Sequence, residues 1–133
     1  MNDEDKTTPN LSILLVDDNG SILEIIKDIL VRGLNAKVDL ASTGQIAFSK
    51  LREKNYDLII TDLIMPDIDG EHLVSSVRAG QVLNTDEMKS IPIIIISGRP
   101  IEGELLTQLN AHSFAKSNLN DLPGYISYIL FEK

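Results

Sequence analysis

The sequence contains no cysteine and no apolar run long enough to cross a bilayer. Without cysteine, neither a disulfide framework nor a thiolate metal site can form. A membrane-spanning helix needs about 20 consecutive apolar residues, and the polar, acidic stretch from Met1 to Asn10 does not resemble a signal peptide. We therefore expect a cytoplasmic protein in which residues 1–10 form a disordered tail.

Basic residues are also scarce. The chain has 12 Lys and Arg against 20 Asp and Glu, which gives a formal net charge of −8. Direct nucleic-acid binding is disfavoured, because no stripe of Lys and Arg could release counterions from a phosphate backbone. No repeat, low-complexity tract or internal boundary interrupts the chain, so we expect residues 11–133 to form one domain.

The apolar pattern predicts five strands that alternate with five helices. The predicted strands cover residues 11–16, 37–40, 58–62, 91–96 and 111–115, and the helices cover 22–33, 44–54, 71–79, 100–109 and 120–131. In the first helix Ile22, Ile25, Ile26, Ile29 and Leu30 share one face, which should be buried. This alternation indicates an α/β fold with a doubly wound parallel sheet. A strand order of 2-1-3-4-5 would make it flavodoxin-like.

Polar side chains follow four of the five strands. Asp17 and Asp18 end the first, Asp62 the third, Ser97 the fourth and Lys116 the fifth. With the order 2-1-3-4-5, the three acids meet at the switch point of the sheet, where such folds bind ligands. Like charges about 4 Å apart repel by about 4 kcal/mol near the surface, so clustered carboxylates take up a proton or a cation. Oxygen ligands of this kind favour Mg²⁺ and phosphate chemistry.

These residues, together with Met65-Pro66 and Gly70 after Asp62, resemble the response regulator receiver domains of two-component signalling over nearly the whole chain. The resemblance implies that Asp62 is the phosphoacceptor, and that Asp17, Asp18, Asp62 and the backbone carbonyl of Ile64 bind Mg²⁺. Ser97 and Lys116 would contact the phosphoryl group. The donor would be a histidine kinase or a histidine phosphotransfer protein. The domain would be a signalling module that assists its own phosphorylation and dephosphorylation, not an enzyme.

The chain departs from the receiver pattern at three places. Ser117 stands where receivers commonly have a proline after the lysine, so this peptide bond is expected to be trans and Lys116 differently placed. Ser113 stands where the family usually has a switch aromatic, and Phe114 lies on the opposite strand face. Ile64 and Arg99 are at the positions that flank the attacking water. An apolar Ile64 cannot orient water, which predicts slow self-dephosphorylation.

Several alternatives compete with this interpretation. A degenerate receiver could act as a phosphorylation-independent scaffold. A haloacid-dehalogenase-like phosphotransferase would need a second acid at position 64, and a metal-dependent nuclease is opposed by the charge. The segment 67–70 is interpreted as a turn rather than a calcium loop, and His72 and His112 as histidines without a metal. Tyr125, Tyr128 and Phe131 are interpreted as the rim of the core, with an interaction face as the alternative.

Overall fold

The computed structural model describes residues 10–131, so the predicted tail lies outside the described residues apart from Asn10. Five parallel strands form one sheet in the order β2-β1-β3-β4-β5, which confirms the predicted order. The strands are β1 (Ser12–Val16), β2 (Lys37–Ala41), β3 (Leu58–Asp62), β4 (Ile93–Ser97) and β5 (His112–Ala115). The helices are α2 (Gly20–Leu34), α3 (Gly44–Glu53), α4 (Gly70–Arg78), α5 (Gly103–Leu109) and α6 (Leu122–Phe131).

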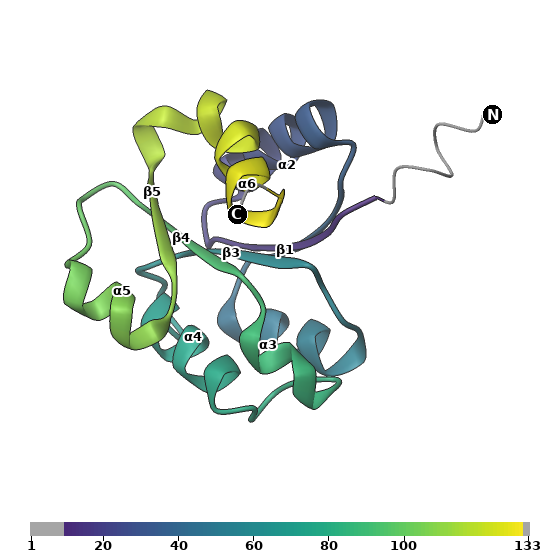
Figure 1. Ribbon diagram of the computed structural model, residues 1–133, viewed down its shortest axis with the longest axis vertical. Helices are drawn as coiled ribbons and strands as arrows, with labels where there is room; N and C mark the ends of the chain where they lie inside the picture. Colours follow the sequence, from purple (N-terminus) through teal and green to yellow (C-terminus); the bar gives the residue numbers. More distant parts are fainter. Residues whose placement is uncertain (1–9, 132–133) are drawn as a thin grey trace.

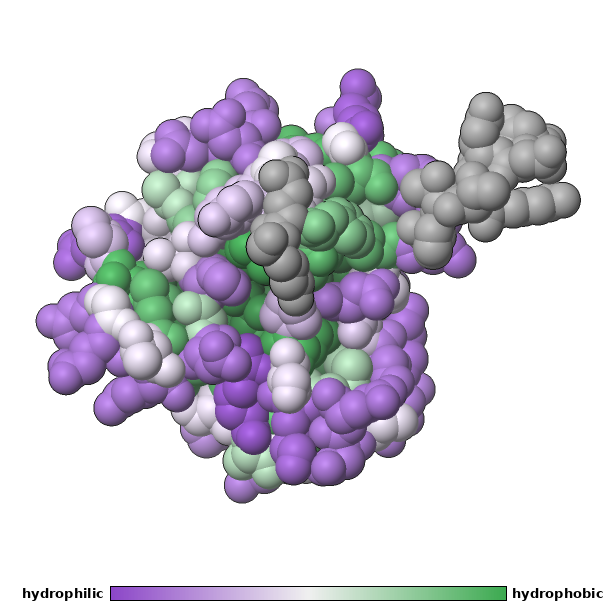
Figure 2. All heavy atoms as spheres, viewed as in Figure 1, coloured by the Kyte–Doolittle hydropathy of each residue, from purple (hydrophilic) through white to green (hydrophobic). Residues whose placement is uncertain are grey.

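Helices cover both faces of the sheet (Figure 1). Helices α2 and α6 lie on one face, and α3, α4 and α5 lie on the other. Every residue of β3 is buried, which explains why residues 58–60 are apolar without alternation before Thr61 and Asp62. Figure 2 shows polar side chains over much of one face of the molecule, with apolar residues visible between them. Within residues 10–131, none of the helices combines the length and the apolar composition that a membrane crossing requires.

The buried face of α2 differs from the prediction. Leu23, Ile26 and Leu30 are buried, whereas Ile25 is 49% exposed. The helix begins at Gly20, because the Asn19 side chain accepts hydrogen bonds from the backbone N–H groups of Ser21 and Ile22. Placing Ile25 on the buried face was therefore wrong: the packing of the helix turns Leu23 inward in its place.

Two other predictions about helices need correction. Helix α5 begins at Gly103, not at Pro100, and residues 100–102 are not helical. At the end of the chain, Tyr125 is half-buried against Phe114, with ring centroids 5.1 Å apart. Tyr128 and Phe131 are more than 60% exposed, so the interpretation of both as core rim is wrong.

The turn after Asp62 contains Asp67 and Asp69, the two acids of the segment that was compared with a calcium loop. Asp67 accepts hydrogen bonds from the backbone N–H groups of Gly44 and Gln45 at the start of α3, and Asp69 caps α4 through the N–H of His72. Both carboxylates thus hold helix ends, which agrees with the interpretation of this segment as a turn.

Candidate functional site

Three carboxylates meet at the carboxyl end of the sheet. In the register of β1 and β3, Val16 pairs with Thr61, so Asp17 and Asp62 come next on adjacent strands. One oxygen from each of Asp17, Asp18 and Asp62 lies within 4.8 Å of the others. Asp17 and Asp62 are buried and Asp18 is exposed. The structure therefore brings together the acids that the sequence placed at the switch point.

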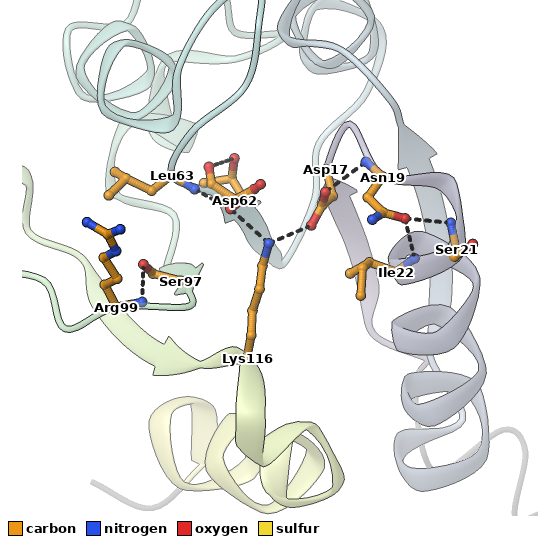
Figure 3. Close-up of polar contacts among 10 residues, drawn as sticks. Asp17, Asn19, Ser21, Ile22, Asp62, Leu63, Ser97, Arg99 and Lys116 are labelled. Carbon is orange, nitrogen blue, oxygen red and sulfur yellow. Dashed lines mark hydrogen bonds and ion pairs between the residues drawn. The ribbon is translucent and has the colours of Figure 1, made fainter.

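Lys116 reaches this carboxylate cluster from the end of β5 (Figure 3). Its Nζ lies 3.3 Å from Asp62 Oδ1 and 3.7 Å from Asp17 Oδ2. No cis peptide bond occurs among the described residues, so the bond between Lys116 and Ser117 is trans, as predicted. The expectation that Lys116 would be displaced is wrong, because the trans chain still delivers the ammonium group to Asp62.

Asp62 is held by the backbone that follows it. Its Oδ1 accepts a hydrogen bond of 2.9 Å from the Leu63 N–H, and the Gly70 N–H donates to the Leu63 carbonyl. A Cβ at Gly70 would lie 2.2 Å from the Asp62 carbonyl oxygen, so only glycine allows α4 to begin this close to the strand end. The sequence marked Gly70 as a turn residue, but this contact could not be inferred from it.

Ser97 stands on the other side of the cleft. Its Oγ accepts a hydrogen bond of 3.1 Å from the Arg99 N–H, which orders the first turn of the loop after β4 (Figure 3). An open cleft of about 480 Å³ is lined by residues 62–64, residues 97–100 and Lys116. Ile64 is 76% exposed beside this cleft. The cleft thus contains an acid, a hydroxyl and a lysine, with an apolar side chain next to them.

Ionisation of Asp17 is unfavourable because its side chain is buried beside two other carboxylates. Burial raises the pKa of the Asp17 carboxyl above its ordinary value of 3.8, and the nearby Asp62 and Asp18 carboxylates act in the same direction. The Asn19 N–H, which donates a hydrogen bond of 2.9 Å to Asp17 Oδ1, and the Lys116 ammonium oppose this shift. A bound cation would relieve the remaining repulsion.

The donor set fits a hard divalent cation. Mg²⁺ is bound in proteins by one or two carboxylates with further oxygens from water or phosphate, and Asp17, Asp18 and Asp62 offer carboxylate oxygens at the required proximity. Within residues 10–131 this trio is the one group of acids and histidines that could hold a metal. His72 and His112 lie outside this trio, edge-on to Phe48 and Tyr125 respectively.

Comparisons with known proteins agree with this geometry. The family model described as the response regulator receiver domain matches residues 13–114. The transcriptional regulatory protein ResD of Bacillus subtilis is 36% identical over 92 residues, which cover 69% of this chain and 35% of that protein. The chain spans 10% and 26% of two further curated relatives. The matched region thus spans about a third or less of the length of these three curated relatives.

Solved structures share the fold. Vibrio cholerae chemotaxis protein CheY4 superposes with a TM-score of 0.81 at 24% identity, over 92% of this chain and all of that one. The receiver domain of a sensor histidine kinase from Pseudomonas aeruginosa gives a TM-score of 0.76 at 24% identity, over 94% of this chain and all of that one. That domain was solved with a magnesium ion coordinated in its active site cleft.

Proposed function

Because this chain belongs to the response regulator receiver domain family of two-component signalling, we propose that Asp62 accepts a phosphoryl group from a phosphohistidine. The donor is a histidine kinase or a histidine phosphotransfer protein, and the phosphorylated domain changes its contacts with a downstream protein. We assign the receiver to residues 11–133 and the reaction to the cytoplasm. The observation that carries this proposal is the position of Lys116 Nζ between Asp62 and Asp17.

The chemistry follows from the groups around Asp62. Oδ1 is held by the Leu63 N–H and Lys116, which leaves Oδ2 to attack phosphorus. The new bond joins Asp62 to phosphorus as the bond from phosphorus to the histidine nitrogen breaks, and the electron pair leaves with the imidazole. Lys116 and the Ser97 hydroxyl then contact the phosphoryl oxygens, on which negative charge develops.

Asp17, Asp18, Asp62 and the Ile64 backbone carbonyl would hold Mg²⁺. When bound, this ion supplies positive charge that offsets the carboxylates and the incoming phosphoryl oxygens. Its charge also lowers the cost of keeping Asp17 ionised, since the pKa of that buried carboxyl is raised. The donor set and its compactness support this assignment.

Intact-mass spectrometry after incubation with Mg²⁺ and a small acyl-phosphate donor tests the proposal. We expect a single phosphoryl adduct on the unchanged chain, and none with Asp62→Asn or with a chelator. Asp28→Asn is the matched control, because Asp28 is an exposed acid on α2 outside the cleft, and it should be phosphorylated normally. Absence of an adduct on the unchanged chain would favour the scaffold alternative, which no feature of the cleft supports.

Loss of the phosphoryl group should be slow. Ile64 is exposed beside the cleft and has no group that could orient an attacking water. We predict that Ile64→Gln, which adds a hydrogen-bonding side chain, speeds dephosphorylation by about tenfold, equivalent to about 1.4 kcal/mol of barrier. The measurement is the decay of the adduct in the mass spectrum. Ile25→Gln, at an exposed isoleucine on α2, should leave the decay rate unchanged. Rapid decay of the unchanged protein would contradict this prediction.

A further inference from the structure

A second cavity lies next to the phosphorylation cleft. It has a volume of about 270 Å³ and is walled by Ser97 and loop residues 98–101 on one side and by residues 113–115 of β5 on the other. The cavity and the cleft share residues 97–100 but otherwise have different walls. The proposed phosphotransfer chemistry does not use this space.

Small side chains on β5 leave the space open. Ser113 pairs with Ile95 and Ala115 pairs with Ser97, so these residues share the face of the sheet that α5 covers. Neither serine nor alanine is large enough to fill the gap beneath the loop. The late start of α5 at Gly103 keeps the preceding residues non-helical above the gap.

The aromatic residue next to this position cannot fill it. Phe114 follows Ser113 and therefore points to the opposite face of β5. There it packs with the core between the sheet and helices α2 and α6, and its ring lies 5.1 Å from that of Tyr125. A group that occupies the cavity must therefore come from outside this chain's β5.

The cavity wall suits an apolar group. Pro100, Ile101 and Ala115 supply apolar surface, and the Ser97 hydroxyl is already engaged by the Arg99 N–H. A free metabolite is normally oriented by several placed polar groups, whereas the other polar side chains of this wall are only Ser113 and the exposed Arg99. An aromatic side chain carried on a partner's backbone needs none, because the partner positions it.

We propose that this cavity binds an aromatic side chain of a partner protein, and that binding is linked to phosphorylation through residues 97–100. This link rests on the proposed function. When the Ser97 hydroxyl turns to a phosphoryl group on Asp62, its bond with the Arg99 N–H must change and a polar group leaves the cavity wall. Phosphorylation therefore strengthens binding of the aromatic group, and by reciprocity that group strengthens the phosphorylated state.

The probe for the first test is p-cresol, the side-chain analogue of tyrosine, titrated into the ¹⁵N-labelled protein without a phosphoryl analogue. We expect a dissociation constant of about millimolar size, as befits a ligand with so few atoms. The amide signals of Gly98, Ile101, Ser113 and Ala115 should shift in a saturable way. No saturable shift, or shifts centred on another surface, would overturn the proposal.

Filling the cavity provides the matched variants. Ser113→Phe should weaken p-cresol binding by about tenfold or more and Ser113→Val by about threefold, while Ser49→Phe, on an exposed position of α3, should have no effect. The amide spectrum of each variant reports whether it is folded, and Ser113→Val keeps the test valid if the larger residue is not accommodated. Unchanged binding in a folded Ser113 variant would overturn the site.

Titration with free tyrosine tests whether the cavity binds a partner's side chain or a free metabolite. Arg99 is the one charged residue of the cavity wall and it is exposed, so pairing with the carboxylate of free tyrosine adds little and free tyrosine should bind no more tightly than p-cresol. A gain of about tenfold with free tyrosine would assign the cavity to a small amino acid and overturn the partner interpretation.

Mg²⁺ with beryllium fluoride, an analogue of the phosphoryl group, tests the link. Its binding should shift the signals of Asp62 and Leu63 and tighten p-cresol binding by about fivefold. Analogue binding without any change in p-cresol affinity would overturn the link. Failure of the analogue to bind would overturn the proposed function and the link with it, whereas the cavity would still be judged by the first titration.

Discussion

Asp17 combines near-complete burial with two neighbouring carboxylates, which makes its negative charge costly. Its pKa is raised, chiefly by burial, so the folded protein holds this proton more tightly than the unfolded chain does. Stability is therefore lost as the pH rises from 3.8 through the folded pKa, and at neutral pH the full cost is present. A residue that we propose to bind the cation thus opposes folding when no cation is bound.

Asp17→Asn should accordingly raise the free energy of unfolding by about 1 kcal/mol in a chelator. It should also reduce the additional stabilisation that Mg²⁺ provides, because one carboxylate ligand is lost. Thermal denaturation with a chelator and with saturating Mg²⁺ measures both effects. Asp28→Asn, at an exposed acid, should change stability by less than about 0.5 kcal/mol in either condition. A destabilised Asp17→Asn protein in the chelator would contradict the prediction.

Asp39 shows the opposite behaviour. The Tyr56 hydroxyl donates a hydrogen bond of 2.7 Å to Asp39 Oδ2 and lowers the pKa of Asp39, and Lys54, with its Nζ 3.3 Å from the same oxygen, adds to the effect. A lowered folded pKa contributes stability that is present above pH 3.8 and is lost as the pH falls through the folded value. This pair links β2 to the connection between α3 and β3.

Tyr56→Phe should therefore cost about 1 kcal/mol at neutral pH, and the pKa of Asp39 should rise. The difference between the two proteins should shrink as the pH falls from 3.8 through the lowered folded pKa of Asp39, below which Asp39 is protonated in both proteins. Denaturant unfolding at neutral and acidic pH measures the stability, and NMR titration measures the pKa. A stability difference that stays constant with pH would mean that Tyr56 contributes only by packing.

At the scale of elements, Arg78 joins three segments. Its guanidinium donates to the backbone carbonyls of Leu109 and Asn110 at the end of α5, and to those of Lys89 and Ile91 before β4. Burial lowers the pKa of Arg78, yet four acceptors surround it. Helix α4 is thereby tied to the residues just before β4 and to the end of α5. Strand β4, which ends at Ser97, and helix α5 are the two elements that the loop of residues 98–102 connects.

Arg78→Lys should destabilise the protein by about 2–3 kcal/mol, because one ammonium cannot reach carbonyls arranged for a planar group with five donors. Denaturant unfolding measures the loss. Arg32→Lys is the control: Arg32 is 79% exposed and pairs only with Asp28 among the described residues, so its replacement should cost less than about 0.5 kcal/mol. Equal effects of the two substitutions would show that the four carbonyls contribute no more than an exposed ion pair.

At the scale of the whole molecule, the net charge of −8 makes the compact state repel itself. Raising the monovalent salt concentration from about 0.01 M to about 0.15 M shortens the screening length from about 30 Å to about 8 Å. We expect this change to raise the free energy of unfolding by several tenths of a kcal/mol to about 1 kcal/mol. Thermal denaturation in NaCl and in KCl should give the same increase. A decrease would mean that surface ion pairs outweigh the general repulsion.

The sequence by itself determined the strands and the polar residues at their ends, Asp17, Asp62, Ser97 and Lys116. Each is a local pattern, an apolar run that stops at a polar group, and parallel strands carry such ends to one edge. The meeting of these side chains at one edge of the sheet could be predicted for this reason. The strand order has no local pattern in the sequence. The order 2-1-3-4-5 was predicted from the expected fold, and the structure confirms it.

Tertiary structure alone decided the features that join distant residues. Leu23 and Ile25 are both apolar, and packing against the sheet and α6 determines which of them is buried. Asp67 caps α3 across 23 positions of the chain, and Arg78 reaches carbonyls more than 30 positions away. Such contacts leave no periodic trace in the sequence, because their geometry exists only after the layers have assembled. The open cavity beside Ser113 has the same origin, since it forms where a small side chain meets a loop from another strand.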